Sequence, residues 1–132
     1  MAPISVNTSR VQSFRYLAAW QRPIELCIVI YTLTAQFPKT ETFGLTAQLR
    51  RAAVSVASNV AEGHERLTTL QFLQFLGNAR GSNGELATQL VIAKALGFGA
   101  QKDLDKAQGL CSEVGRLLNG LIKSLQSKLP NP

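Results

Sequence analysis

The residue types that could carry out chemistry are few in this sequence. It holds one histidine, His64, and two cysteines, Cys27 and Cys111, which do not form a Cys-x-x-Cys pair. A di-metal site in a helical bundle needs Glu-x-x-His on two helices, and the single histidine follows Glu62 at the wrong spacing. No serine or cysteine stands beside it in the pattern of an activated nucleophile. We therefore expect no metal site, no cofactor and no catalytic residues, and so a protein that is not an enzyme.

Two stripes of polar residues have the spacing of helix faces. One recurs at steps of four, four and three, and the other at steps of three and four. The functional interpretation is a site for a ligand or for RNA. The structural interpretation, which we favour, is a polar seam in which Arg pairs with Glu, because buried polar groups need partners. The stripes are Arg51, Ser55, Asn59 and Glu62 in one segment, and Ser82, Glu85 and Gln89 in the other.

Composition and charge limit the kinds of partner. The 132 residues are 45% hydrophobic but only 17% charged, and the net charge is +6. Such a chain often buries part of its surface against other copies, and positive charge attracts polyanions such as nucleic acid. The longest apolar run, Leu26–Tyr31, is far shorter than the ~20 residues that span a membrane. Because the N-terminus also lacks the apolar core of a signal peptide, we expect a cytoplasmic protein with no membrane partner.

The spacing of apolar residues predicts four helices, at residues 14–36, 41–62, 68–96 and 101–126. Short connections between helices of this length predict an all-α fold, an antiparallel up-down-up-down four-helix bundle. We expect residues 1–13 to form a flexible N-terminal arm and residues 127–132 to form a C-terminal tail.

Four residues give local expectations about the helix ends. Pro23 either kinks the first helix or marks a start near Arg22. Gly63 is expected to end the second helix as a left-handed cap. Thr68 and Gln71 have the spacing of a capping box that opens the third helix.

Apolar residues on several faces of one helix predict contact between copies. The expected core stripe of the first helix is Leu17, Trp20, Ile24, Cys27 and Tyr31, and the fourth helix has a heptad seam. Apolar side chains beyond these stripes would lie in water in a lone bundle, so their burial favours association. The first and fourth helices should therefore form the subunit interface, with the candidates Leu26, Val29, Ile30, Leu33, Leu110, Leu117 and Ile122.

Several blocks along the chain carry a resemblance to a known family. They are Trp20-Gln21, Tyr31-Thr32-Leu33, Phe37-Pro38-Lys39, Phe43-Gly44-Leu45, residues 48–63, 72–76 and 81–90, and residues 117–122. In their order and spacing, from about Phe14 to Leu125, they resemble a bacterial four-helix bundle family. That family includes proteins encoded in intervening sequences of large-subunit ribosomal RNA genes. It also includes the accessory variability determinant of diversity-generating retroelements.

The resemblance implies an antiparallel bundle that assembles into a ring, commonly a pentamer, and that has no enzymatic activity. The retroelement members are similar in fold and basic, and they bind nucleic acid and a reverse transcriptase. This sequence departs from the family pattern after Gly63, where basic residues are common. Here His64-Glu65-Arg66 carries one Arg and one Glu. Asn83-Gly84 also stands where an apolar residue and a helix former are expected.

We therefore interpret the chain as a non-enzymatic homo-oligomer, in particular a pentamer, that binds RNA or an RNA-associated protein through a basic surface. The alternative is a protein–protein assembly module whose positive charge is incidental. Guanidinium groups are fixed positive charges suited to phosphate, and no aromatic platform for base stacking is evident, so binding should be poorly sequence-specific. The candidate phosphate contacts are Arg15, Arg22, Arg50, Arg66 and Arg80.

Overall fold

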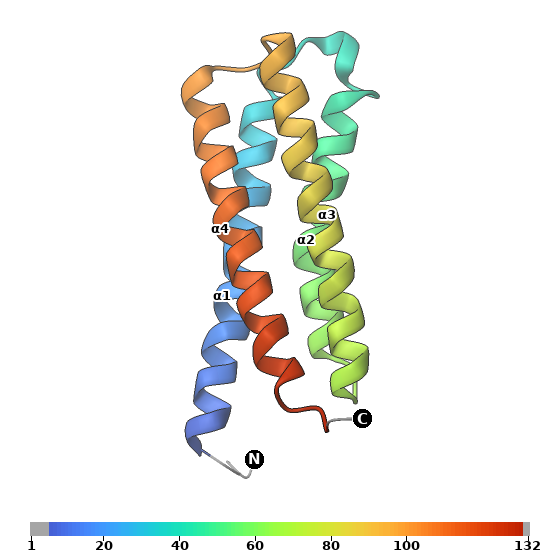
Figure 1. Ribbon diagram of the computed structural model, residues 1–132. Coiled ribbons are helices and arrows are strands. Elements are labelled where there is room, and N and C mark those ends of the chain that lie inside the picture. The colour runs from blue at the N-terminus through green and yellow to red at the C-terminus, as the bar shows by residue number, and fades with distance from the viewer. Residues whose placement is uncertain (1–5, 131–132) are drawn as a thin grey trace.

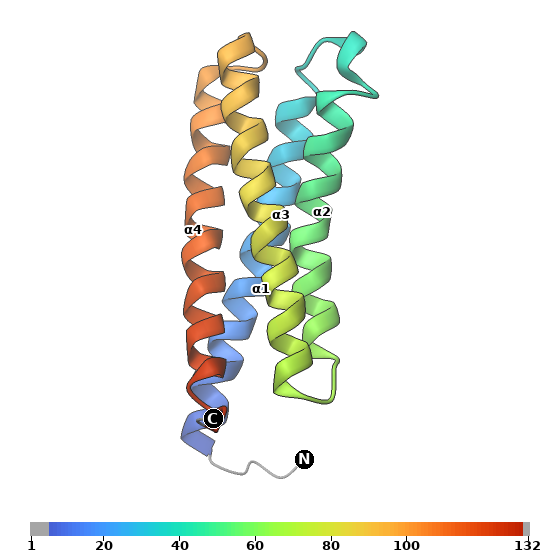
Figure 2. The ribbon, with the colours of Figure 1, turned by 45° about the vertical axis from the view of Figure 1, so that its right-hand side comes forward.

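Four long helices lie side by side and run alternately up and down (Figures 1 and 2). The computed structural model describes residues 6–130. The helices are α1 (Val6–Thr34), α2 (Leu45–His64), α3 (Thr69–Leu96) and α4 (Gln101–Gln126), with the short 3-10 helix η1 (Lys39–Glu41) between α1 and α2. This arrangement confirms the all-α antiparallel four-helix bundle.

One hydrophobic core runs along the bundle. Each helix packs against two neighbours, in the pairs α1–α2, α2–α3, α3–α4 and α1–α4, so the four inner faces enclose a common interior. The heptad seam expected for α4 is confirmed, because its steps of three and four keep these residues on one side of the helix. All seven positions are buried: Leu104, Ala107, Cys111, Val114, Leu118, Leu121 and Leu125.

Helix α1 buries a different face from the expected one. Leu26, Ile30 and Leu33 are fully buried, whereas Leu17 is 45% exposed and Tyr31 is 43% exposed. Trp20 and Cys27 of the expected stripe are half-buried and pack against the core, so the stripe lies beside the buried face and was wrong as its centre. Because α1 has apolar residues on several faces, spacing alone does not select the inner one. Pro23 lies inside the helix and is buried, which excludes a start near Arg22.

The N-terminal boundary also differs from the expectation. Residues 6–13 belong to α1 and are not part of a flexible arm. The segment from Val6 to Arg22 contains no glycine or proline, and extending an existing helix costs little once its nucleus has formed. Residues 1–5 of the expected arm lie outside the described residues. At the other end α4 stops at Gln126, as expected, and residues 131–132 of the tail lie outside the described part.

Helix α2 begins and ends later than expected. Glu41 was assigned to this helix, but it precedes the helix, and its Oε1 accepts a hydrogen bond from the amide of Leu45 at 3.0 Å. Gly63 is helical rather than a left-handed cap. A Cβ atom at Gly63 would lie 2.8 Å from Cβ of Phe75. The glycine therefore allows α2 and α3 to approach closely near the loop that joins them.

The ends of α3 follow from its capping residues. The Thr68 side-chain oxygen accepts a hydrogen bond from the amide of Gln71 at 3.1 Å, which is the N-cap half of the predicted capping box. At the other end Gly97 has a φ of 74°, the left-handed conformation that glycine adopts without steric cost. This turn reverses the chain into α4.

Candidate functional site

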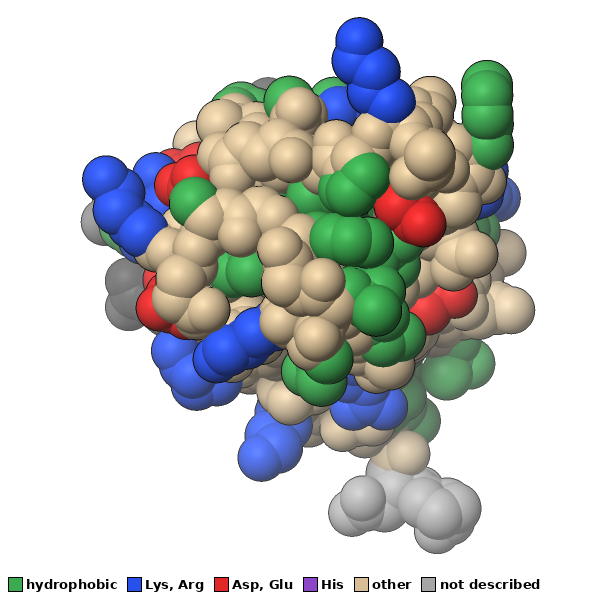
Figure 3. Space-filling view, turned by 90° about the horizontal axis from the view of Figure 1, so that it is seen from above, with side chains coloured by type: hydrophobic (Ala, Val, Ile, Leu, Met, Phe, Trp, Pro, Cys, Tyr) green, Lys and Arg blue, Asp and Glu red, His purple; other side chains and the backbone are tan. Residues whose placement is uncertain are grey.

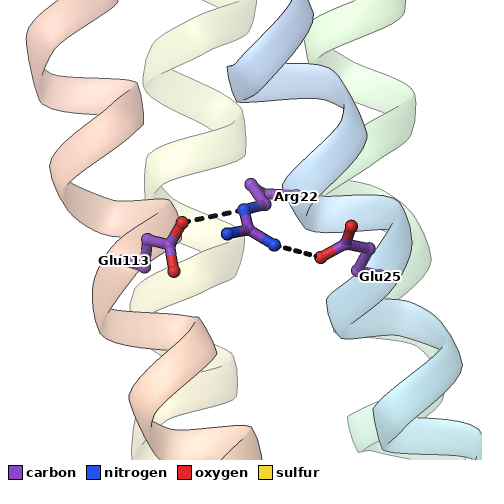
Figure 4. Close-up of polar contacts among 3 residues, drawn as sticks. All are labelled: Arg22, Glu25 and Glu113. Atoms are coloured by element: carbon purple, nitrogen blue, oxygen red, sulfur yellow. Dashed lines mark hydrogen bonds and ion pairs between the residues drawn. The ribbon is translucent and has the colours of Figure 1, made fainter.

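Arg22 is held between α1 and α4 by two carboxylates. Its guanidinium pairs with Glu25 on α1, and its Nε lies 2.8 Å from a carboxylate oxygen of Glu113 on α4 (Figure 4). The hydrogen bond to Glu25, followed by the negative charges of Glu113 and Glu25, raises the pKa of Arg22. Because two acids compensate its charge, this residue is a poor phosphate contact, contrary to the sequence-based expectation.

Arg50 and Arg66 are also engaged within the chain. Nε of Arg50 donates to the hydroxyl of Thr34 at 2.9 Å, and the guanidinium lies 4.5 Å from the ring centre of Tyr31. Arg66 pairs with Glu62 at 2.9 Å. Both arginines therefore tie neighbouring parts of the bundle together, and the charge of Arg66 is compensated.

Arg80 and Arg15 reach α4 from opposite sides. Nη1 of Arg80, on α3, donates to Oδ1 of Asn119 at 3.2 Å. Nη1 of Arg15, on α1, lies 3.4 Å from the position that a Cβ atom at Gly120 would occupy. An amide partner and a glycine carry no charge, so these two guanidinium groups keep their full positive charge near the middle of the C-terminal half of α4.

Two basic residues that sequence reasoning missed complete this surface. Arg116 and Lys123 are exposed, and their positions along α4 place them between the faces of Asn119 and Gly120. A sequence signal was present, because residues 114–130 contain three basic residues and no acidic one. We call the set Arg15, Arg80, Arg116 and Lys123 the α4 basic patch.

The predicted polar seam between α2 and α3 is present in part. The hydroxyl oxygens of Ser55 and Ser82 lie 2.8 Å apart, and Nδ2 of Asn59 donates to Oγ of Ser55 at 3.0 Å. The expected pairing of Arg with Glu across the seam was wrong. Glu62 pairs with Arg66 at the end of α2, because that partner lies one helical turn away.

The other three members of the two stripes line a groove. Arg51 on α2 and Glu85 and Gln89 on α3 surround an open space of about 330 Å³ between the two helices. Arg51 and Glu85 are exposed, whereas Gln89 is buried. We call this space the α2–α3 groove.

Most of the predicted interface residues lie inside the bundle. Leu26, Ile30 and Leu33 are fully buried, and Ile122 is 7% exposed, so they cannot form a surface between copies. The remaining three, Val29, Leu110 and Leu117, are half-buried and pack against the core. The expectation was wrong for the three α1 residues because it followed from the wrong core stripe of α1, and for Ile122 because this residue packs beside the α4 seam. For Val29, Leu110 and Leu117 it stays a prediction.

Most of the exposed large apolar side chains of the long helices lie elsewhere, on α1 and α3. On α1 they form a stripe that includes Phe14, 78% exposed, and Ile28, 63% exposed. On α3, Val91 borders a groove of about 310 Å³ that Gly84 and Gly115 also line. We call this second space the α3–α4 groove.

The end of the bundle that carries the α1–α2 and α3–α4 connections differs from the α4 basic patch in the distribution of its charges. Seen from above, its hydrophobic side chains gather near the centre, while Lys and Arg are spread around the rim with Asp and Glu among them (Figure 3). The exposed residues near this end include Phe43 and Leu96. This end therefore has no concentrated positive field, unlike the α4 basic patch.

His64 has a packing role at the opposite end of the bundle. Its ring stacks on Tyr16 with 3.7 Å between ring centres and meets the ring of Phe72 edge-on. Burial, and then the negative charge of Glu65, raises the pKa of Tyr16. In residues 6–130, no group of three or more His, Cys, Asp or Glu side chains is placed to hold a metal ion. No helix in this described range is long and apolar enough to cross a membrane.

Comparisons with known proteins agree with the fold. The family model described as 23S rRNA-intervening sequence protein matches residues 15–120. A crystal structure of a protein of unknown function from the S23 ribosomal protein family of Bacteroides thetaiotaomicron superposes with a TM-score of 0.76. The two sequences are 17% identical, and the match covers 83% of this chain and 98% of that one. No curated protein matches the chain.

Proposed function

The chain belongs to the 23S rRNA-intervening sequence protein family, and we propose that it is a non-enzymatic, self-associating bundle that binds RNA. The α4 basic patch is the observation that supports this proposal. Its four cationic side chains come from three helices. Arg80 and Arg15 lie over α4 at Asn119 and Gly120, and Arg116 and Lys123 are exposed on the face of α4 between these positions. A protein–protein assembly module with incidental charge is the competing interpretation.

The patch differs from two of the predicted phosphate contacts in the state of its charges. Arg22 and Arg66 are neutralised by carboxylates, whereas Arg80 contacts an amide. A phosphate group can bind the Arg80 guanidinium beside its amide partner, or in place of it, without first breaking an ion pair. Uncompensated guanidinium and ammonium groups bind phosphate oxygens and release counterions. The α4 basic patch is therefore the surface best suited to a nucleic-acid backbone.

A binding assay with matched variants tests the RNA proposal. The patch variant combines Arg80→Gln, Arg116→Gln and Lys123→Gln. We expect it to weaken binding to a structured ribosomal RNA fragment and to lower the slope of log affinity against log salt by about one for each lost phosphate contact. Fluorescence anisotropy over a salt series measures both quantities.

The control variant removes the same amount of charge elsewhere. It combines Lys94→Gln, Lys102→Gln and Lys106→Gln, at the end of the bundle where Asp103 and Asp105 also lie. This variant should retain a slope and affinity close to those of the wild-type protein. Equal losses in both variants, or no RNA binding by the wild type at low salt, would refute the proposal and leave the assembly module.

Self-association is the second part of the proposal, and two complementary surfaces support it. The exposed stripe of α1 carries bulky apolar side chains, including Phe14 and Ile28. The α3–α4 groove is hollow and is lined by small residues such as Gly84 and Gly115. Large side chains of one copy can fill the groove of the next. Such a heterologous contact closes into a ring when its rotation allows, and a pentamer is the form that the family resemblance suggests.

Light scattering after size exclusion tests this contact. Ile28→Glu should release monomers with an unchanged helical circular dichroism spectrum, because it places a charge in the apolar contact. Val54→Glu is the control, since Val54 is an exposed apolar residue on α2 and should leave the assembly intact. A monomeric wild type at micromolar concentration, or an intact assembly in Ile28→Glu, would contradict the proposed contact.

A further inference from the structure

The α2–α3 groove contains a buried acceptor without a partner. Gln89 is 7% exposed, and its Oε1 accepts no hydrogen bond from the residues that the structure describes. Most buried polar atoms in folded proteins are paired, so an unpaired one requires an explanation. Gln89 lines the groove, but its Oε1 atom is itself closed to solvent. A rotation of the amide about the last side-chain bond would turn Oε1 toward a donor in the groove.

Two opposite charges face the same groove without forming an ion pair. Ser55 and Ser82 meet at 2.8 Å, which fixes the level of the antiparallel helices relative to each other. One turn further, Arg51 on α2 and Glu85 on α3 stand at similar levels, and both line the groove. Neither forms an ion pair with any other side chain in the described range. The groove thus has a positively charged side chain on its α2 wall and a negatively charged one on its α3 wall.

We propose that the α2–α3 groove binds a small zwitterion of the free α-amino acid class. Its ammonium group would donate to the Glu85 carboxylate and, once the Gln89 amide has turned, to Gln89 Oε1. Its carboxylate would accept from the Arg51 guanidinium. A simple anion would meet the negative charge of Glu85, and a simple cation would meet the positive charge of Arg51. A molecule with both charges can form charge-assisted hydrogen bonds with Glu85 and with Arg51 at the same time.

The size and position of the groove are consistent with this occupant. A space of about 330 Å³ lies at the lower end of the range for small-molecule sites. The groove lies between α2 and α3, whereas the α4 basic patch lies over α4. Binding in the groove is therefore independent of the proposed RNA contact, and either proposal can fail without the other.

Calorimetry and thermal unfolding with a panel of free amino acids test the site. At millimolar concentration, at least one amino acid should raise the unfolding temperature and give a saturable heat of binding. Its two single-charge analogues, the amine without the carboxylate and the acid without the amine, should give neither. Equal binding of an analogue, or no response to any amino acid in the panel, would overturn the proposal.

Three substitutions connect the response to the groove. Arg51→Gln, Glu85→Gln and Gln89→Leu should each weaken binding by about tenfold or more, because each removes a hydrogen bond to a charged group. The control Lys102→Gln on α4 should leave the affinity unchanged. If Glu85→Gln and Arg51→Gln bind the amino acid as well as the wild type does, the groove is not the site. The unfolding temperature of each free variant shows whether it is folded before the ligand is added.

Discussion

Helix α3 places one buried amide side chain against α4 and another against α2. These two side chains differ in whether their polar atoms have hydrogen-bond partners. Toward α4, Nδ2 of Asn83 donates to the carbonyl of Cys111 at 3.0 Å, and the thiol of Cys111 donates to Oδ1 of Asn83 at 3.3 Å. Toward α2, the Oε1 atom of Gln89 has no donor among the residues of the described chain. The two side chains have the same chemistry and lie less than two helical turns apart.

This difference separates a structural contact from a candidate binding contact. A reciprocal pair such as Asn83 and Cys111 contributes to stability, because both partners leave water together. A buried acceptor without a donor lowers stability, because it loses hydration and gains nothing in the free protein. The same substitution, amide to leucine, should therefore have opposite effects at the two positions.

The largest effect is expected at Asn83. Asn83→Leu removes the hydrogen bond from Nδ2 to the carbonyl of Cys111 and the Oδ1 acceptor of the thiol, which keeps only the backbone carbonyl of residue 83 at 3.5 Å. We expect a loss of about 2–3 kcal/mol in the free energy of unfolding, measured by urea denaturation. Asn78→Leu, at an exposed position of α3, is the control and should change stability little; a similar loss there would show that the Asn83 contact is not the cause.

The Cys111 side of this contact predicts a dependence on pH. Burial raises the pKa of Cys111 from 9.0 to about 11. In the unfolded chain the thiol ionises first, so the unfolded state releases the proton at lower pH than the folded state does. The stabilising contribution is therefore complete below about pH 9 and is lost as the pH rises through 11, with a total of about 3 kcal/mol. Urea denaturation at several alkaline pH values measures it.

Cys111→Ala separates this contribution from the ionisation of tyrosine and lysine side chains. The variant should be less stable near neutral pH, because Asn83 loses a partner. Its stability should nevertheless fall less steeply between about pH 9 and 11. An unchanged slope would show that the alkaline loss arises from other groups.

The contrast between α4 and α1 shows which parts of the fold were predictable. The buried face of α4 follows from its sequence, because steps of three and four repeat along the whole helix and place seven apolar residues on one side. Its further apolar residues, Leu110, Leu117 and Ile122, flank this seam and pack with it. In α1 apolar residues occur around most of the helix, so packing against α2 and α4 selects Leu26, Ile30 and Leu33. That choice is a tertiary effect and is absent from local spacing.

The candidate sites were predictable to a different extent. The two polar stripes were recognised as a unit from helical periodicity, and the structure brings Ser55 and Ser82 together. The sequence could not show that Gln89 Oε1 lacks a donor, because that depends on the orientation of every neighbouring group. It also could not show that Arg22 is neutralised, since Glu113 is distant in the chain. Charge counts identify basic residues but not their partners.

Gln89→Leu should have a smaller effect than Asn83→Leu and the opposite sign. Leucine fills a similar volume and removes the acceptor that has no partner. We expect the unfolding free energy of the ligand-free protein to rise by about 1 kcal/mol, as measured by urea denaturation. A loss comparable to that of Asn83→Leu would mean that Gln89 is satisfied in solution, and the contrast between the two sides of α3 would then disappear.

The smallest effect is expected at the serine pair that holds α2 and α3 together. Ser55 and Ser82 are half-buried, and the hydrogen bond between their hydroxyls competes with water, so its net contribution should be about 0.5–1 kcal/mol. A double-mutant cycle of Ser55→Ala and Ser82→Ala measures this coupling directly, because the cycle cancels the effect of each side chain on its other neighbours. Ser55 also accepts from Asn59 at 3.0 Å, so Ser55→Ala alone should cost more than Ser82→Ala alone. A coupling energy near zero would mean that the two hydroxyls turn toward water. The serine pair would then not hold α2 and α3 together beside the α2–α3 groove. A measurable coupling energy would show that the serine pair links α2 and α3. A gain in the unfolding free energy for Gln89→Leu would show that the Gln89 acceptor lacks a donor in the ligand-free protein. Both results together are what a binding groove between two linked helices requires.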